Sequence, residues 1–195
     1  QWRYNPGLEH YFPGDWKMTV DLMYSDVKDE VLWQDVRLQQ TGTAPDGRPI
    51  YSPLADGRSS STQDLVLGNT SGGKSTIFTI DLSKSWETKA GYIDLYAGYG
   101  HQDVLDVNPG TSSQASSNWD NVATADPNNP GLATSNYEIE HRLTLALNWK
   151  KAFFSDAYTS AGLFLEPRSG RPYSYTFGRN STIFGDPRQS SRQRQ

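Results

Sequence analysis

The sequence predicts an all-β protein: an antiparallel transmembrane β-barrel segment of about six long strands that form an incomplete barrel. Three observations lead to this fold class. Apolar and polar residues alternate with a period of two in several runs, short and long connections alternate along the chain, and aromatic residues gather beside the short connections. Together they indicate strands with one apolar and one polar face.

The composition of the 195-residue chain fits a protein with one thin apolar face. Hydrophobic residues make up 35% of the chain, a low share for a globular protein, whereas aromatic residues reach 12%. The net charge of −4 provides no basic surface for nucleic acid, so no nucleic-acid partner is expected. Cysteine is absent, which excludes disulfides and thiolate chemistry. No stretch approaches the roughly 20 apolar residues of a membrane helix.

The alternation marks the strands in chain order, the first at about residues 2–12. Five further runs have apolar residues at every second position, which helical spacing does not produce. Their apolar rows are Met18, Val20, Leu22 and Tyr24; Phe78, Ile80 and Leu82; Ile93, Leu95, Ala97 and Tyr99; Leu143, Leu145, Leu147 and Trp149; and Ala161, Leu163 and Leu165. Such runs have roughly the 9–11 residues that a tilted strand needs to cross a bilayer. The alternation alone also fits a large soluble antiparallel β protein.

Short and long connections alternate strictly between these strands. The short ones are Pro13–Asp15, Glu87–Gly91 and Phe153–Asp156. The long ones, at about 26–73 and 101–136, are rich in Gly, Ser, Asn, Asp and Pro and are expected to be structureless. Compact soluble domains rarely contain two such loops, whereas bacterial barrels have short periplasmic turns and long extracellular loops. The connections therefore favour the barrel.

Aromatic residues flank each short connection. Trp16 follows the first and Trp86 precedes the second, while Trp149 and Phe153 lie at the third. Aromatic rings of this kind prefer the headgroup region of a bilayer, so these four residues are expected to form an interfacial girdle at the periplasmic rim. The simpler explanation is that aromatic residues favour strands in general.

Four carboxylates alternate with the apolar rows: Asp21, Asp81, Asp94 and Glu166. A charge that faces lipid is costly, so these residues are expected to face the lumen of the barrel. There they could contact a plug domain or a passing ligand. Solvation and cross-strand pairing, for example with Lys150, is the plainer role for each of them.

Several motifs resemble one group of bacterial proteins. They are DVNPGTSS (106–113), SNW (117–119), DPNNP (126–130), SNYEIEHR (135–142) and RSGRPYSY (168–175). These motifs resemble TonB-dependent outer-membrane receptors of the Oar-like group, also described as carboxypeptidase-regulatory-like or OmpA-related. The first hairpin, with WRYN at 2–5 and PGDW at 13–16, is similar to a barrel hairpin of that group. The resemblance covers nearly the whole chain up to about Phe177.

The resemblance implies a barrel of about 22 strands with an N-terminal plug. Such a receptor takes up a bulky ligand across the outer membrane of a Gram-negative cell, using energy from the TonB complex. Residues 1–177 are thus expected to be part of the barrel, with the lipid bilayer, the TonB complex and an unidentified ligand as partners. The plug and the TonB-contacting segment would lie outside the chain. Residues 178–195 depart from the group's pattern and are expected to be a polar, basic tail, truncated or disordered.

No catalytic constellation is found in the sequence, so neither an enzyme nor a cofactor is predicted. The histidines His10, His101 and His141 are scattered over different strands without metal-binding spacing, and no metal site is assigned to them. Asp120 and Asp126 could hold Ca²⁺ in a loop, with turn formation as the plainer role.

Three functions remain open. The leading prediction is a ligand-uptake barrel that binds through its long loops, with Trp33 and Trp119 as candidate ligand contacts. The alternative is a soluble carbohydrate-binding β-sandwich, in which the same tryptophans stack on sugars and a second sheet covers the apolar rows. The third is a smaller barrel, an enzyme or a porin without a plug. The sandwich requires Leu82, Leu95 and Leu145 in a two-sheet core.

Overall fold

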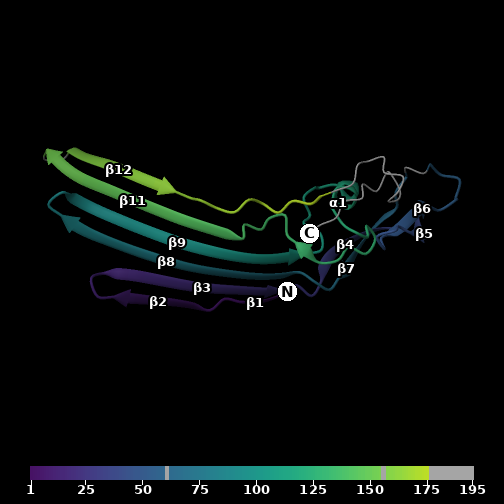
Figure 1. The fold of residues 1–195 in the computed structure, drawn as a ribbon, viewed down its shortest axis with the longest axis horizontal. Helices are drawn as coiled ribbons and strands as arrows, with labels where there is room; N and C mark the ends of the chain where they lie inside the picture. The colour runs from purple at the N-terminus through teal and green to yellow at the C-terminus, as the bar shows by residue number, and fades with distance from the viewer. Residues whose placement is uncertain (60–61, 155–156, 176–195) are drawn as a thin grey trace.

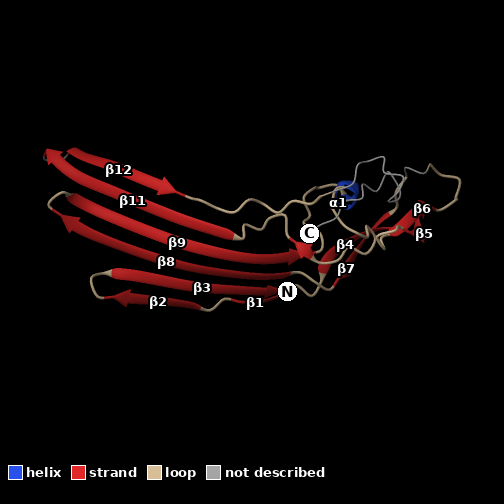
Figure 2. Ribbon diagram, in the orientation of Figure 1, coloured by secondary structure: helices blue, strands red, loops and turns tan. Residues whose placement is uncertain are grey.

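The computed structural model describes residues 1–59, 62–154 and 157–175 of the chain. This part of the chain is all-β with antiparallel pairing, as predicted: one eight-stranded sheet and two sheets of two strands each (Figure 2). Its one helix, α1 (Ala115–Asp120), has six residues, and no helix here is long and apolar enough to cross a bilayer. The expected boundary at residue 177 and the basic tail lie outside the described residues.

The large sheet is formed by strands that follow one another in chain order. They are β1 (Trp2–Tyr4), β2 (Gly7–Phe12), β3 (Trp16–Asp26), β8 (Lys74–Thr88), β9 (Gly91–Asp106), β10 (Ala133–Thr134), β11 (His141–Phe154) and β12 (Ala157–Leu165). Both β1 and β2 pair with β3, because Pro6 lacks an N–H group and interrupts the first predicted strand. The short β10 only extends the ladder beside β9. Six strand paths therefore cross the sheet, as the alternation predicts.

The short connections all lie at one end of the sheet and the long ones at the other (Figure 1). Positive φ angles at Gly14 (81°) and Asp15 (62°) close the first hairpin. At Gly91 the φ angle is 129°, and a Cβ there would lie 2.6 Å from the carbonyl oxygen of Lys150. Part of the third short turn, residues 155–156, lies outside the described residues. We call the two ends the turn end and the cap end.

The expectation of two structureless loops is wrong. The first long connection contains two antiparallel sheets of two strands each, formed by β4 (Glu30–Asp35) with β7 (Leu65–Thr70) and by the hairpin of β5 (Leu38–Thr43) and β6 (Pro49–Pro53). The second begins later than predicted, because β9 continues to Asp106 in register with β8, and it contains α1 and β10. We call residues 27–73 and 107–140 together the cap.

The only buried apolar side chains among the described residues are in the cap: Ala44, Val107, Trp119 and Val122. In the large sheet, Leu82 is 36% and Leu163 is 50% exposed. The large strands contact chiefly their hydrogen-bonded neighbours, and in the described chain no second sheet packs on them. The large sheet is therefore a single layer, and Leu82, Leu95 and Leu145 do not form the two-sheet core that the sandwich requires.

Candidate functional site

The strand register brings the apolar rows of all strands to one face of the large sheet. Met18 lies opposite Leu82, and Leu82 lies opposite Ala97. Beyond Ala97, β11 contributes Leu145 and β12 contributes Leu165. Because residues two apart in a strand share a face, the remaining apolar rows follow in parallel lines. We call this surface the apolar face and its opposite the polar face.

The four predicted girdle residues lie on the apolar face at the turn end. Trp16 and Trp86 stand on either side of Lys84, whose Nζ is 5.0 Å and 5.6 Å from their ring centroids. Trp149 and Phe153 are in edge-to-face contact, with centroids 6.1 Å apart. Lys151, on the same face of β11, has its Nζ 5.4 Å from the ring centroid of Phe153. Such contacts hold both ammonium groups beside aromatic rings.

A second group of rings lies on the same face towards the cap end. Tyr4 and Tyr24 have ring centroids 6.4 Å apart, and Tyr99 stacks on His141 at 6.2 Å. Along β3, eight residues separate Trp16 from Tyr24, which corresponds to about 26 Å of strand. Aromatic residues therefore border the apolar face at both ends. Of these two groups, only the one at the turn end was predicted as a girdle from the sequence.

The predicted lumen carboxylates lie on the polar face or at its edge. Asp21 and Asp81 lie two residue pairs apart in the ladder between β3 and β8, and Asp94 belongs to the same face of β9. Glu166 directly follows β12 and forms an ion pair of 2.7 Å with Arg142. The structure thus spreads the four carboxylates over the polar face and brings them together at no single point.

Hydroxyl groups satisfy two of these carboxylates. The Tyr96 hydroxyl donates a hydrogen bond of 2.5 Å to Asp81, and the Ser85 hydroxyl donates one of 2.5 Å to Asp94. Lys150, the partner suggested by the sequence, instead lies with its Nζ 4.5 Å from the centroid of the Tyr158 ring. The polar face therefore carries local side-chain hydrogen bonds between neighbouring strands.

The two halves of the cap are joined by Asn128. Its Oδ1 accepts hydrogen bonds from the backbone N–H of Asp35 (2.8 Å) and from the indole N–H of Trp119 (3.2 Å). Its Nδ2 donates to the carbonyl oxygen of Asp35 (2.9 Å), and its own carbonyl accepts from the Gln34 side chain (2.8 Å). One amide side chain thus connects the first long connection with the second.

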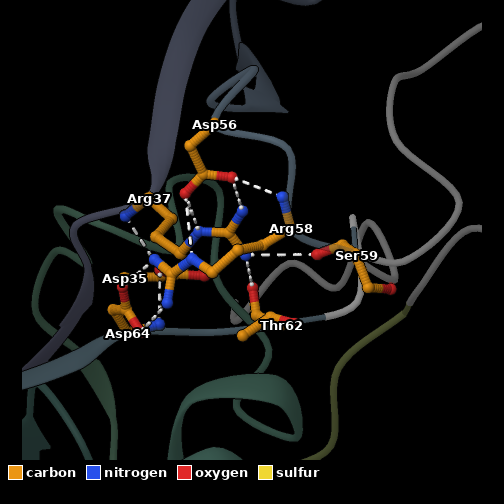
Figure 3. Close-up of polar contacts among 7 residues, drawn as sticks. All are labelled: Asp35, Arg37, Asp56, Arg58, Ser59, Thr62 and Asp64. Atoms are coloured by element: carbon orange, nitrogen blue, oxygen red, sulfur yellow. Dashed lines mark hydrogen bonds and ion pairs between the residues drawn. The ribbon is translucent and has the colours of Figure 1, made fainter.

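A buried arginine holds the first half of the cap together (Figure 3). Arg37 is 2% exposed, and its guanidinium donates two hydrogen bonds to Asp56, at 2.7 Å and 3.2 Å. It also donates to the carbonyl oxygens of Ser59 (3.2 Å) and Thr62 (2.5 Å). The hydrogen bonds that the Asp56 carboxyl accepts, led by those from Arg37, hold its pKa well below its usual range.

A second arginine extends this cluster towards water. Arg58 is half-exposed and forms ion pairs with Asp56 and Asp64, and the hydrogen bond to Asp64 is the main reason why the pKa of Arg58 is raised. Asp35 is 2% exposed, and its Oδ1 accepts hydrogen bonds from the backbone N–H of Arg37 and of Asp64. These charges are all used within the cap, which indicates a structural role.

The loop residues proposed from the sequence have different positions. Trp33 is half-buried on β4, but Trp119 is 7% exposed and belongs to the core of the cap, so its ring is not available to a ligand in this arrangement. Asp120 accepts a hydrogen bond of 2.9 Å from Gln63. Asp126 accepts one of 3.0 Å from the Tyr51 hydroxyl and closes an Asx turn with the backbone N–H of Asn128. Burial and this hydrogen bond raise the pKa of Tyr51 to about 12.

Two adjoining cavities open at the cap end. They have volumes of about 570 Å³ and 320 Å³ and share Arg171, Pro172 and Tyr173, which follow β12. Tyr137 lines the larger cavity and Glu138 the smaller one. Tyr137 and Tyr173 are 57% and 70% exposed. The sequence did not identify these residues as ligand contacts, because only the folded chain brings the segment after β12 against the cap.

Two of the three histidines lie side by side, which corrects the expectation that all three are scattered. His101 on β9 lies directly opposite His141 on β11, with ring centroids 5.1 Å apart. Glu140 is adjacent, with its Oε1 3.4 Å from Nε2 of His141. His10 stays apart from them, beside Phe12 near the turn end. The 39 residues between His101 and His141 conceal this pair in the sequence.

No protein-family model, no curated protein and no solved structure matches this chain.

Proposed function

We propose that the chain is part of the barrel of a TonB-dependent receptor in the bacterial outer membrane, where it contributes to uptake of a bulky ligand. The proposal rests mainly on the apolar face, which extends over all six strand paths with no second layer on it in the described chain. In water such a surface is unfavourable, whereas lipid tails solvate it at no cost. The TonB-dependent class itself comes from the loop motifs at 106–142 and 168–175.

The aromatic residues at the two ends of the sheet support one orientation of the sheet across the outer membrane. In this proposal the turn end faces the periplasm, with Trp16, Trp86 and Trp149 in the inner headgroup region. The cap end faces the outside, with Tyr24 and Tyr99 in the outer headgroup region. The distance between the two aromatic groups, about 26 Å along a strand, becomes about 20 Å across the membrane for a strand tilted by roughly 40°. This is close to the height of the apolar band in outer-membrane barrels, about 25 Å.

The two edges of the sheet support a larger assembly. Among the described residues, β12 pairs only with β11, and β1 and β2 pair only with β3. Open edges in lipid would leave backbone N–H and C=O groups without partners. Additional strands on both sides are therefore part of the proposal, and the polar face then lines the enclosed lumen. Asp21, Asp81 and Asp94 would face the plug or the ligand there.

The cavities beside the cap are the proposed point of ligand entry. Tyr137 and Tyr173 offer exposed rings with hydroxyl groups, and Arg171 offers a cation. Such a surface suits a polar ligand with apolar parts, held by stacking and charge-assisted hydrogen bonds. The carbohydrate-binding sandwich is less well supported, because Trp119 is in the core of the cap and the apolar face lacks a covering sheet.

Fractionation of cells that produce the full-length protein tests this proposal. We expect the protein in the outer membrane, resistant to extraction by salt and by alkaline carbonate. We also expect it to migrate faster on a gel before boiling than after, as a folded barrel does. A protein that is folded and monodisperse in water without detergent would overturn the proposal, because its apolar face would then need a cover of protein.

A further inference from the structure

The histidine pair at the cap end has the composition of a metal site. His101, His141 and Glu140 each offer one ligand atom, and these three atoms lie within 4.8 Å of one another. The cross-strand register of β9 and β11 sets the spacing of the two histidines, so the pair is part of the sheet and not of a mobile loop. Imidazole nitrogen and carboxylate oxygen are ligands that Zn²⁺ and similar divalent ions prefer.

The hydrogen bonds of the two imidazole rings involve Nδ1 and leave Nε2 of each ring available to bind a metal ion. Nδ1 of His101 lies 3.0 Å from the carbonyl oxygen of Glu140. A carbonyl can only accept, so Nδ1 carries the proton and Nε2 of the neutral ring has a free lone pair. Nδ1 of His141 lies 2.9 Å from the Tyr99 hydroxyl, which can accept the proton of that nitrogen in the same way. Metal-binding histidines show this pattern, in which the second nitrogen is held by an oxygen.

The distance between two of the three ligand atoms matches that of a metal-bound pair. Nε2 of His141 and Oε1 of Glu140 are 3.4 Å apart. Two ligand atoms at bond lengths of 2.0–2.1 Å and a tetrahedral angle are separated by about 3.3 Å. The side chains of His141 and Glu140 are 53% and 58% exposed, so an ion can reach them from water. The ligand atom of His101 lies within 4.8 Å of those of His141 and Glu140.

We propose that His101, His141 and Glu140 bind one divalent transition-metal ion, Zn²⁺ by preference, with water as the fourth ligand. The ion bridges β9 and the first residue of β11, where the chain passes from the cap into the sheet. Binding to the folded state alone would stabilise this junction in proportion to metal concentration. This proposal depends only on the pairing of β9 with β11 and holds whether or not the barrel is a transporter.

Titration of the purified full-length protein with Zn²⁺, without an affinity tag that contains histidine, tests the site. We expect His101→Gln and His141→Gln to remove one equivalent of bound Zn²⁺ from the stoichiometry of the unmodified protein. The matched control is His10→Gln, which changes the third histidine at the opposite end of the same face and should leave the stoichiometry unchanged. Co²⁺ in place of Zn²⁺ should give the intense visible absorption of a tetrahedral complex, and this absorption should disappear in the first two variants.

Tyr99→Phe keeps the three ligands and removes only the hydroxyl beside His141. We expect roughly 10–100-fold weaker Zn²⁺ binding at unchanged stoichiometry, because an oxygen partner of this kind orients a metal-binding imidazole. Gel mobility before boiling reports whether each variant is folded. Equal Zn²⁺ stoichiometry in the unmodified, His101→Gln and His141→Gln proteins would overturn the proposal, as would an equal loss in His10→Gln. The Tyr99→Phe result decides the question if either histidine variant does not fold.

Discussion

The large sheet and the cap are built on opposite principles. The sheet has long strands and exposed leucines, such as Leu143 at 48% and Leu163 at 50%, and none of its described apolar side chains is buried. The cap has short strands, yet it contains every buried apolar side chain of the described part of the chain, together with the buried Arg37. The cap therefore follows the rules of a small water-soluble domain. The apolar face of the sheet can be kept away from water only if lipid or another protein surface covers it.

The two regions also use charge differently. In the cap, Arg37 and Asp35 are both 2% exposed, and their polar atoms bind each other, groups in residues 56–64 and Asn128. Because the cap buries few apolar side chains, it is held together by a polar network, in which each member depends on the others. In the sheet, hydrogen bonds between backbones hold the strands, and the side chains add local contacts. Substitutions in matched pairs can separate these two modes.

The largest effect is expected from Arg37→Ala. The variant removes four hydrogen bonds that the buried guanidinium donates, two to Asp56 and one each to the carbonyl oxygens of Ser59 and Thr62, so we expect the cap to lose about 3–5 kcal/mol of local stability. Hydrogen exchange of the amides in residues 30–70 measures this loss. Arg58→Ala is the control, because its half-exposed ion pairs are screened by water and should contribute much less. Equal effects of the two variants would show that burial of Arg37 does not determine the strength of the network.

A lysine introduced on each face of β8 in turn tests which face of the sheet contacts lipid. Ile80 lies on the apolar face between Val20 and Tyr99, so Ile80→Lys should cost about 2–4 kcal/mol in a membrane. Thr79→Lys moves the same charge to the polar face, opposite Asp21, where we expect no loss or a gain of a few tenths of a kcal/mol. The midpoint of urea unfolding in lipid vesicles measures both. A similar loss in both variants would contradict a lipid-facing apolar face.

The sequence predicted the sheet because its information is local. A period of two can be read within each strand. It assigns Asp21, Asp81 and Asp94 to the polar face without knowledge of the partner strand. The short turns are equally local, since Pro13, Gly14 and Asp15 are turn residues by their own chemistry. In the proposed barrel, lipid on one side of the sheet would strengthen this signal, because one entire face would have to remain apolar.

The cap and the histidine pair were missed because their information is not local. The strands β4 and β7 lie about 30 residues apart and show little alternation, so neither indicates its partner. Asn128 and Arg37 look like ordinary loop residues, and only the folded chain brings them to Asp35 and Asp56. His101 and His141 meet only in one register of β9 and β11, and a shift of two residues would separate them without changing the apolar face.

A smaller effect is expected from Asn128→Ala, which tests whether the two halves of the cap are one unit. The variant leaves the N–H and C=O groups of Asp35 and the indole N–H of Trp119 without their partner. We expect a loss of about 1–3 kcal/mol that appears in both halves. Asn129→Ala changes the exposed neighbouring amide and should have little effect. Hydrogen exchange that increases only in residues 107–140 would mean that the halves fold independently.

The smallest effect is expected on the polar face of the sheet, at Gly98. A Cβ at this position would lie 2.5 Å from Oδ1 of Asp81 and 2.8 Å from the Tyr96 hydroxyl oxygen, so Gly98→Ala must displace the hydrogen bond between them. We expect a loss of about 1 kcal/mol, because both groups are flexible side-chain ends that can turn to water.

Gly100→Ala is the matched control on the same face of β9. Its Cβ would meet only ordinary contacts, the nearest being Cγ2 of Thr79 at 3.8 Å, so the variant should be neutral or about 0.4–1 kcal/mol more stable. The difference in urea midpoint between the two alanine variants isolates the Tyr96–Asp81 hydrogen bond. If the midpoints are equal, the polar face is simply solvated, and the contrast with the hydrogen-bonded cap is greater than the structure indicates. If Gly98→Ala is less stable, hydrogen bonding between side chains orders the sheet on its wet side as it orders the cap.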